Sequence, residues 1–246
     1  MSDFKNIAVI AGTSESAVFI EAFQNKYSIT AFAATELGRD MLEGLECRIH
    51  TGRLDYDGFI EILPQFDCVV DMSHPFAVEV TRTVRKVCNA ENIPYFRAGR
   101  EKQHYNYKRI ITVSDKFRAA DYLNSCPESR ILFTTGANTL LFYAENIIDF
   151  RKRAFVRIIN TPESLNRCCG YMDNIITGMP PFTSDDTYNL IKKYDIDILV
   201  SKDSGKRGGV LEKINAAKKA DIPVILIESP ENRMNLMSIE ELLNEF

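Results

Sequence analysis

Four short segments carry hydroxyl, imidazole or cationic side chains, the types that bind phosphates and carboxylates, and three of the four also contain glycine. The densest is 201–209, Ser-Lys-Asp-Ser-Gly-Lys-Arg-Gly-Gly, which lies between an apolar run at 196–200 and a helix-like run at 210–220. Glycine lets the backbone approach a ligand closely, and a helix N-terminus offers N–H groups and a positive dipole end. This segment therefore predicts an anion-binding loop.

Two further turns share one pattern of strand, hydroxyl, glycine and helix. They are 11–16, Ala-Gly-Thr-Ser-Glu-Ser, and 133–138, Phe-Thr-Thr-Gly-Ala-Asn. Their hydroxyls either cap a helix or bind a phosphate, and spacing alone leaves both interpretations open. Neither turn is a G-x-G-x-x-G or Walker motif.

The fourth segment, 71–77, places an acid, a hydroxyl and an imidazole together at a strand end. His74 can orient a ligand or move a proton, or it can cap the next helix while bonded to Asp71. Pro75 suits the first turn of that helix. Beyond the next strand, Arg97 and Arg100 either fork onto ligand carboxylates or remain solvated surface charges.

Short apolar runs alternate with amphipathic stretches along the whole chain. The longest helical pattern spans 76–92, and a capping box predicts a final helix at 238–246. The predicted strands are 6–11, 28–33, 47–51, 66–72, 94–97, 110–113, 130–135, 154–159, 174–177, 195–201 and 223–227.

This alternation predicts an α/β fold with mainly parallel sheets. Eleven strands are many for one open sheet, so we expect two doubly wound, Rossmann-like lobes with a cleft between them. The break by composition lies at 124–129, which predicts lobes at 1–124 and 125–246. Ligands of such folds bind beyond the carboxyl ends of the strands, where the four segments lie.

Composition excludes several function classes. A net charge of −4 argues against general nucleic-acid binding, and no apolar run is long enough to span a membrane. The six cysteines form no C-x-x-C pair, which argues against a zinc or redox site, and we expect no metal bound by the protein. The absence of a signal peptide pattern predicts a cytoplasmic protein.

Two other motifs favour structural roles. Tyr188 and Lys192 match the Tyr-x-x-x-Lys pair of short-chain dehydrogenases, but no glycine fingerprint accompanies them, so we interpret them as helix surface. The segment 180–186 predicts a rigid turn that caps a helix.

Together the motifs resemble the precorrin-6A reductases of cobalamin biosynthesis, including the cobalt-precorrin-6A reductases of the anaerobic route. The specific matches are Asp-Met-Ser-His-Pro-Phe-Ala at 71–77 and Lys-Asp-Ser-Gly-x-x-Gly-Gly at 202–209. Weaker matches lie at 11–15, 93–97 and 134–136, so the resemblance covers almost the whole chain in order. The chain departs from the family pattern at Ala11, Ser16, Glu101, Pro180 and Ser229.

The resemblance implies an NADPH- or NADH-dependent reduction of a carbon–carbon double bond in the precorrin-6A macrocycle, a corrinoid precursor with many carboxylates. With it we expect the cofactor to be bound by Gly12, Thr13, Ser14, Glu15, Thr135, Gly136, Lys202, Asp203, Ser204 and Gly205. We expect the substrate to be bound by Asp71, Ser73, His74, Pro75, Arg97, Arg100, Arg207, Gly208 and Gly209. The alternative is a two-lobed module that binds a nucleotide or tetrapyrrole without chemistry.

Several points stay open at this stage. Glu36 is the only acid near the second strand that suits a ribose, and Arg39 suits a 2′-phosphate, so NADH and NADPH are not distinguished. The residues do not identify the proton donor or distinguish cobalt-loaded from metal-free substrate. We expect a monomer or a weak homo-oligomer, because no coiled coil or long apolar stripe is present.

Overall fold

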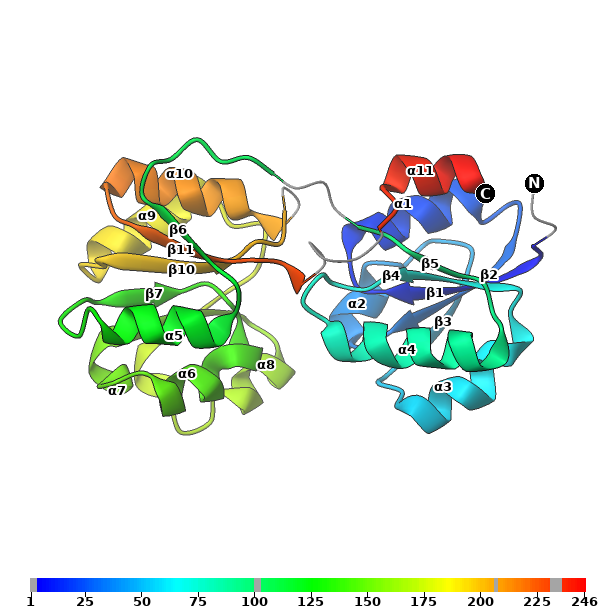
Figure 1. The fold of residues 1–246 in the computed structure, drawn as a ribbon, viewed down its shortest axis with the longest axis horizontal. Helices are drawn as coiled ribbons and strands as arrows, with labels where there is room; N and C mark the ends of the chain where they lie inside the picture. Colours follow the sequence, from blue (N-terminus) through cyan, green and yellow to red (C-terminus); the bar gives the residue numbers. More distant parts are fainter. Residues whose placement is uncertain (1–3, 100–102, 206–207, 231–235) are drawn as a thin grey trace. The chain divides into compact units, whose positions relative to one another are not determined.

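The computed structural model of the chain describes residues 4–99, 103–205, 208–230 and 236–246. The chain folds into two compact units, each with its own sheet and helices (Figure 1). Unit 1 consists of Met1–Lys102 and Pro230–Phe246, and unit 2 consists of Gln103–Ser229. Each unit has the parallel α/β architecture predicted from the sequence.

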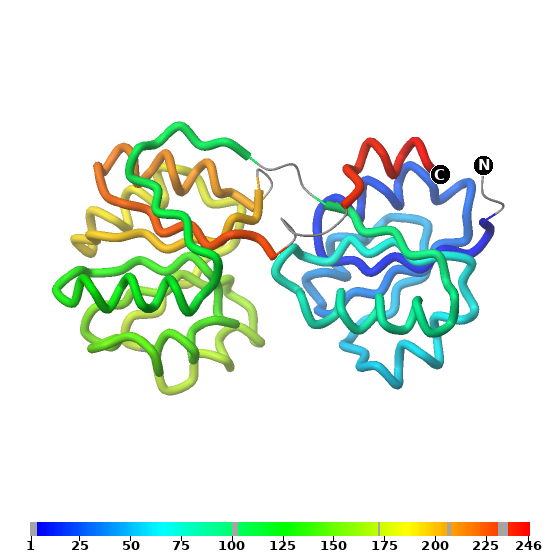
Figure 2. Tube along the Cα trace, in the orientation of Figure 1, coloured from blue at the N-terminus to red at the C-terminus, as the bar shows by residue number. Residues whose placement is uncertain are grey.

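This division differs from the predicted lobes 1–124 and 125–246 in two ways. Unit 2 begins at Gln103 and not at residue 125, and the C-terminal residues from Pro230 belong to unit 1. Strand β6 (Ile110–Val113) pairs in parallel with β11 (Val224–Ile227), so it belongs to unit 2. The last residues return to unit 1, where the Met237 N–H donates to the Arg97 carbonyl at 3.0 Å. Figure 2 shows this red segment beside the blue N-terminal part of the chain. The polar segment 124–129, which suggested a boundary, is a loop inside unit 2.

Unit 1 contains a five-stranded parallel sheet in the order β3-β2-β1-β4-β5. The direction of strand order reverses between β1 and β4, and β4 is buried along its whole length. The strands are β1 Asn6–Ala11, β2 Ser28–Ala33, β3 Arg48–Thr51, β4 Cys68–Met72 and β5 Tyr95–Arg97. The helices are α1 Ser14–Phe23, α2 Glu36–Asp40, α3 Tyr56–Ile62, the 3₁₀ turn η1 Leu63–Gln65, α4 Val78–Glu91 and α11 Ile239–Glu245.

Alternate residues of β1 divide between two cores, as the period of a strand requires. Ile7 and Val9 pack in a cluster with α1 and α11, whereas Ala8 and Ile10 pack in another with α3 and α4. Figure 1 shows these two pairs of helices on opposite faces of the sheet. The continuous apolar run of β1 therefore reflects burial on both faces.

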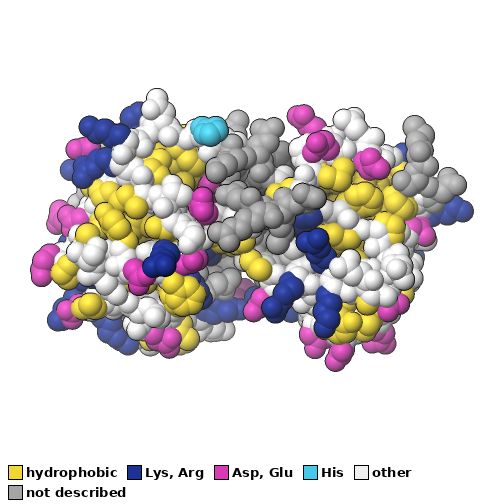
Figure 3. All heavy atoms as spheres, in the orientation of Figure 1, with side chains coloured by type: hydrophobic (Ala, Val, Ile, Leu, Met, Phe, Trp, Pro, Cys, Tyr) yellow, Lys and Arg dark blue, Asp and Glu magenta, His cyan; other side chains and the backbone are white. Residues whose placement is uncertain are grey.

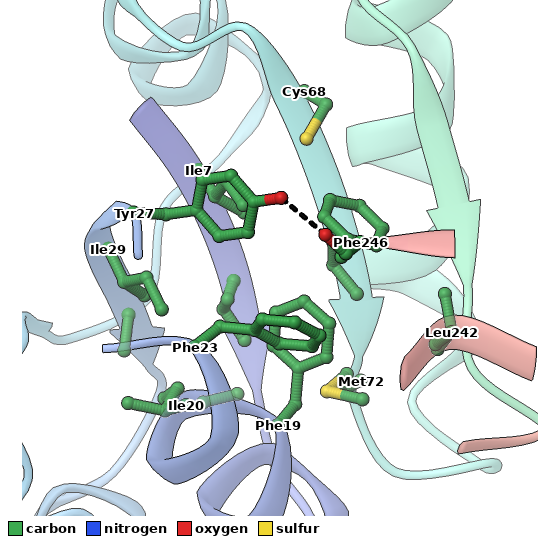
Figure 4. Packing of buried hydrophobic residues seen from close by; sticks show 14 of the residues in the cluster. Ile7, Phe19, Ile20, Phe23, Tyr27, Ile29, Cys68, Met72, Leu242 and Phe246 are labelled. Carbon is green, nitrogen blue, oxygen red and sulfur yellow. Dashed lines mark hydrogen bonds between the residues drawn. The ribbon is translucent and has the colours of Figure 1, made fainter. Parts of the chain in front are cut away.

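The C-terminal segment is part of the unit 1 core. Phe246 packs against Phe19, with ring centroids 5.3 Å apart, and its carbonyl accepts a bond from Tyr27 Oη at 2.5 Å (Figure 4). The predicted capping box that starts α11 is present, because Ser238 and Glu241 bond reciprocally. Burial of this aromatic cluster is the physical reason why the chain returns to unit 1.

Unit 2 contains a six-stranded parallel sheet in the order β6-β11-β10-β7-β8-β9, whose strand order reverses between β7 and β10. Its other strands are β7 Ile131–Phe133, β8 Ala154–Ile159, β9 Ile175–Gly178 and β10 Ile198–Lys202. Its helices are α5 Lys116–Asn124, η2 Ala137–Thr139, α6 Leu140–Asn146, α7 Phe150–Arg153, α8 Pro162–Arg167, η3 Met172–Asn174, α9 Ser184–Lys193 and α10 Val210–Ala220.

All eleven predicted strands are confirmed, and the differences are at their ends. The strand expected at 195–201 begins at Ile198, because Asp195 has a φ of 47° at the end of α9. The helix expected at 76–92 begins at Val78, so Pro75 lies in the turn before it and not in its first turn. The segment 180–186 caps α9 as predicted, with Thr183 as the N-cap residue.

The cysteines are free thiols, and burial raises the pKa of Cys68 and of Cys88 to about 12. These two thiols are therefore poor nucleophiles at neutral pH. Within the described ranges no helix is long and apolar enough to cross a membrane. The same ranges contain no cluster of three His, Cys, Asp or Glu side chains that could hold a metal ion.

Candidate functional site

The four segments singled out in the sequence lie in pairs, one pair in each unit. In unit 1 they follow β1 and β4, and in unit 2 they follow β7 and β10. These strands are the neighbours between which strand order reverses, and parallel α/β sheets bind ligands beyond the carboxyl ends of such strands. Each unit therefore has one candidate site at its topological switch point.

In unit 1 the turn after β1 lies against the loop after β4. A Cβ atom on Gly12 would lie 3.1 Å from the backbone nitrogen of His74 and 3.2 Å from the Ser73 Cα, so only glycine fits without a backbone shift. Thr13 Oγ1 donates to the Met72 carbonyl at 3.0 Å, and the Gly12 N–H donates to Ser16 Oγ at 3.3 Å. The two loops are thus fixed to each other before any ligand arrives.

A small pocket opens at this junction. It is lined by Thr13, Glu15, Met72, Ser73, Pro75, Ala98 and Gly99. It brings together residues expected to bind the cofactor and residues expected to bind the substrate. The end of β5 completes the lining, a contribution that the sequence motifs did not indicate.

Arg97 holds the β4 loop from within the protein. Its Nη1 donates to Asp71 Oδ1 at 2.8 Å, to the Asp71 carbonyl at 3.0 Å and to Ser73 Oγ at 3.1 Å. The side chains of the Arg97–Asp71 pair are 3% and 0% exposed. These two residues were expected to bind the substrate, and the structure places their side chains in a buried network at the β4 loop. Their separation of 26 positions hides this pairing from local sequence patterns.

Tyr95 belongs to the same network and was missed in the sequence. Its Oη donates to Asp71 Oδ2 at 2.7 Å. Burial raises the pKa of the Tyr95 hydroxyl, and the charge of Asp71 raises it further, so the hydroxyl stays protonated as a donor. The signal was the i, i+2 spacing of Tyr95 and Arg97, because this spacing places both side chains on one face of β5.

His74 is half-buried at the tip of the same loop. Its Nδ1 accepts a bond from the Phe76 N–H at 3.2 Å. This bond assigns the neutral tautomer, with the proton on Nε2. The Asp71 carboxylate bonds instead to Ser73, Tyr95 and Arg97.

In unit 2 the turn after β7 is tied to β10. The backbone N–H and the Oγ1 of Thr134 both donate to the Val200 carbonyl at 2.9 Å, and Thr135 Oγ1 bonds with Thr139 Oγ1 at 2.8 Å. Gly136 has φ 79° and ψ 172°, a conformation open essentially to glycine alone. The hydroxyls that the sequence offered to a helix cap or a phosphate are therefore partly used within the turn.

The loop after β10 is held by a residue that the sequence analysis did not select. Tyr105 Oη donates to Asp203 Oδ1 at 2.7 Å, and the Asp203 N–H donates to the Ile227 carbonyl at 2.8 Å. Burial, followed by the bond to Asp203, raises the pKa of Tyr105. A separation of 98 residues explains why no sequence pattern linked the two.

Three basic side chains of unit 2 lie near this loop: Arg157 is buried, whereas Lys202 and Lys213 are half-buried. Burial lowers the pKa of Lys202 to about 8, and the charge of Lys116 contributes. Burial also lowers the pKa of Lys213 to about 8; the charges of Arg157 and Lys202 lower it further, and that of Glu212 opposes the shift. Burial lowers the pKa of Arg157 to about 10. Because these cations interact with one another, an anion bound beside them would be stabilised.

Lys213 and Arg157 both have bonding partners within unit 2. Lys213 Nζ donates to the Gly208 carbonyl at 3.2 Å, which links α10 to the glycine loop. The Arg157 guanidinium donates to Thr187 Oγ1 at 2.9 Å and lies 4.2 Å from the centre of the Phe182 ring. Neither Lys213 nor Arg157 was a predicted site residue.

The structure also shows the positions of most of the other residues that the sequence analysis singled out. Ser204 is buried, and Gly205 and Gly209 have φ of 72° and 66° that favour glycine. Glu36 and Arg39, the two candidates for the nucleotide ribose, form an exposed ion pair at 3.4 Å at the start of α2. Tyr188 and Lys192 lie on α9 as expected. Arg100 and Arg207 lie outside the described residues.

Comparisons with known proteins agree on one family. The family profile described as precorrin-6x reductase (CbiJ/CobK) matches residues 6–246. A cobalt-precorrin-6A reductase of Priestia megaterium is 29% identical over 92% of this chain and 91% of its own length. A cobalt-precorrin-6A reductase of Salmonella typhimurium is 25% identical over 92% and 88%.

Two further similar proteins are named precorrin-6A reductases. A precorrin-6A reductase of Mycobacterium tuberculosis (strain ATCC 25618 / H37Rv) is 30% identical over 68% of this chain and 64% of its own length. The solved structure of a CobK precorrin-6A reductase superposes with a TM-score of 0.77 at 18% identity, covering 98% of this chain and 95% of that one. At this identity the superposition supports the shared fold.

Proposed function

The chain belongs to the precorrin-6x reductase family, an oxidoreductase family of cobalamin biosynthesis, and from that premise we propose which reaction each switch point serves. The proposed reaction is the reduction of one carbon–carbon double bond of the precorrin-6A macrocycle, cobalt-loaded or metal-free, to give the precorrin-6B form. NADPH or NADH is the reductant. The main support for the proposal is the position of the family motifs: one pair lies at the switch point of unit 1, and the other pair lies at the switch point of unit 2.

Unit 1 is the proposed nucleotide-binding unit. Its order β3-β2-β1-β4-β5 has the arrangement of a mononucleotide-binding half, and the close approach at Gly12 supports a backbone cradle after β1. Thr13, Ser14 and Glu15 fit this role, because hydroxyl and carboxylate oxygens bond to ribose hydroxyls. When bound, the reduced nicotinamide supplies the hydride.

Unit 2 is proposed to bind the anionic groups of the macrocycle. The support is the set of buried and half-buried cations at its switch point, where Lys202 ends β10. In this proposal Thr135, Gly136 and the loop 202–205, which the sequence analysis assigned to the cofactor, would instead hold the macrocycle, and Gly208 and Gly209 would keep the backbone close to it. Cations at low local dielectric bind carboxylates more strongly than solvated ones do.

The remaining residues act by positioning. Arg97, Asp71 and Tyr95 hold the β4 loop, so that His74 presents its Nε2 proton in one orientation. Tyr105 holds Asp203, which keeps the loop after Lys202 in place. These fixed groups reduce the ordering that ligand binding would otherwise require.

The test is a reduction assay with purified protein. Cobalt-precorrin-6A or metal-free precorrin-6A is mixed with NADPH or NADH, and the loss of nicotinamide absorbance is followed together with the mass of the macrocycle. We expect oxidation of at least one nucleotide and a product heavier by two hydrogens. If both ligands bind but no combination reacts, the chain is a binding module and the proposal fails.

A further inference from the structure

Aromatic and basic side chains form an exposed patch in unit 2 that none of the motifs includes. We call it the platform, and it consists of Lys116, Phe117, Leu141 and Phe142. Phe117 and Leu141 are 59% and 55% exposed, although both are large and apolar. Hydrophobic and basic side chains lie next to each other on the face of unit 2 in Figure 3.

The topology places the platform at the edge of the sheet that carries the unit 2 site. Helix α5 begins at Lys116, shortly after β6 ends at Val113, and α6 begins at Leu140, after the Gly136 turn. Because all strands of this sheet are parallel, both helix starts lie at the carboxyl edge, where Lys202 ends β10. The like charge of Lys116 contributes to the lowered pKa of Lys202, which agrees with their proximity.

The side chains of the platform hold one another in place. The rings of Phe117 and Phe142 meet edge to face, with centroids 4.8 Å apart. Lys116 Nζ lies 4.3 Å from the Phe142 centroid and 5.4 Å from the Phe117 centroid. The ammonium is thus fixed beside an apolar surface and does not extend freely into water.

Asp115, the nearest acid along the chain, does not form an ion pair with the Lys116 ammonium. Asp115 Oδ1 accepts bonds at 2.9 Å from the Phe117 and Arg118 N–H groups, so its carboxylate caps α5. In the described parts of the chain no carboxylate forms an ion pair with Lys116. The platform therefore combines an apolar surface with a cation available to a ligand.

We propose that the platform binds one face of the carboxylate-bearing macrocycle, and that Lys116 binds one of its carboxylates. This inference rests on the proposed function, and it extends the unit 2 site beyond the family motifs. A conjugated ring with peripheral carboxylates matches an apolar aromatic surface with cations at its side. A second copy of the chain fits less well, because a symmetric contact would place Lys116 and Lys202 of both copies together.

Ile148 provides a matched control. It is 56% exposed, as Phe117 is, but its N–H donates to Asn124 at the end of α5, at 2.9 Å. It therefore lies at the opposite end of that helix from Lys116. Substitution of Ile148 removes a similar exposed apolar side chain far from the proposed ligand.

The test measures binding of uroporphyrin, a tetrapyrrole with many carboxylates, by fluorescence titration of the full chain. Phe117→Ser and Lys116→Gln should each weaken binding by about 5-fold or more, whereas Ile148→Ser should change it by less than about 2-fold. Thermal unfolding should be similar for the three variants, since all three residues lie at the surface.

Three results would overturn the proposal. They are no binding of uroporphyrin by the unmodified protein, equal effects of Phe117→Ser and Ile148→Ser, and a change confined to self-association in sedimentation. The last result would assign the platform to a second copy. A failure of the reductase assay alone would reject the proposed reaction and leave this binding result in place, so the two failures are distinguishable.

Discussion

The two units share one architecture but differ in how the charged side chains at their switch points are arranged. In unit 1 the buried charges are paired, because Arg97 and Asp71 lie 2.8 Å apart and Tyr95 and Ser73 complete the network. In unit 2 burial lowers the pKa of Lys202, Lys213 and Arg157, and like charges lower that of Lys202 and Lys213 further, while Glu212 opposes the shift of Lys213 and Asp186 that of Arg157. The charges of the first site are paired with each other, whereas we expect those of the second to be stabilised by a bound anion.

This difference indicates a division of work. Paired charges fix the shape of a loop, since removing either partner leaves the other buried alone. Clustered like charges do not fix a shape, but they raise the affinity for a ligand of opposite sign. We therefore expect the unit 1 network to contribute mainly to stability and the unit 2 cations mainly to binding. Substitutions in the two units should separate these properties.

The largest effect should come from breaking the buried pair of unit 1. Arg97→Met leaves the Asp71 carboxylate buried without its partner, so the free energy of unfolding should fall by about 3–5 kcal/mol in urea denaturation. Arg118→Met is the control, because its pair with Asp121 at 3.4 Å is 72% and 69% exposed. That change should be below about 1 kcal/mol. Equal losses in both variants would contradict a special role for the buried network.

Lys202→Met should show the opposite profile in unit 2. We expect kcat/KM for the tetrapyrrole to fall by at least about 10-fold, which is roughly 1.4 kcal/mol. Stability should rise at neutral pH, because a lysine with a lowered folded pKa destabilises the fold while it is protonated. The gain should shrink as pH rises from about 8 towards the ordinary lysine pKa, because the unfolded lysine then also loses its proton. Unchanged kinetics would remove Lys202 from the site.

The pH dependence of binding should differ between the two ligands. Lys202 and Lys213 have pKa values of about 8, so both lose their charge as pH rises above that value. KM for the carboxylate-bearing substrate should therefore increase above about pH 8, while KM for the nucleotide should change less. The same profile measured on Lys202→Met should be flatter. A parallel rise for both ligands would contradict the division between the units.

A smaller effect is expected from the hydroxyl that holds Asp203. Tyr105→Phe removes one hydrogen bond, which should cost about 1 kcal/mol of stability and lower kcat/KM by about 3-fold to 10-fold. Tyr107→Phe is the matched control, because Tyr107 Oη donates to the Ile222 carbonyl at 2.9 Å. It should cost similar stability and leave the kinetics unchanged. If the two variants behave alike in steady-state kinetics, Tyr105 has no positioning role.

The smallest effect concerns the nucleotide. Arg39 forms an exposed pair with Glu36 at the start of α2, directly after β2. Arg39→Ala should change stability by less than about 0.5 kcal/mol, since exposed pairs contribute little. If Arg39 meets a 2′-phosphate, the KM for NADPH should rise about 3-fold while that for NADH stays constant. Equal changes for both nucleotides would contradict that contact.

The fold was largely predictable because its signals are local. Each strand is a short apolar run between turn residues, and the parallel alternation follows from the helical stretches between them. The domain boundary was not predictable in this way, because the return of Phe246 to the unit 1 core depends on aromatic contacts between the two ends of the sequence. The loop 124–129 resembled a linker only in composition.

The site was predictable at the level of loops but not of roles. The rule for parallel sheets selected four segments that the structure places at the two switch points, because strand ends are visible in the sequence. The pairing of Arg97 with Asp71 was not predictable, because Asp71 is on a different strand and both side chains are buried. Tyr95, Tyr105 and Lys213 were missed for the same reason: their roles depend on long-range contacts. The platform was missed because exposed phenylalanine cannot be distinguished from core phenylalanine by its type.

The most direct test of the central claim follows the hydride itself. The protein is incubated with precorrin-6A, in its cobalt-loaded and metal-free forms, and with NADPH or NADH deuterated at the transferable position of the nicotinamide ring. The account predicts a reduced macrocycle that carries one deuterium on carbon, as detected by mass spectrometry. A reduced product without deuterium from either labelled stereoisomer, or no reduced product at all, would contradict it.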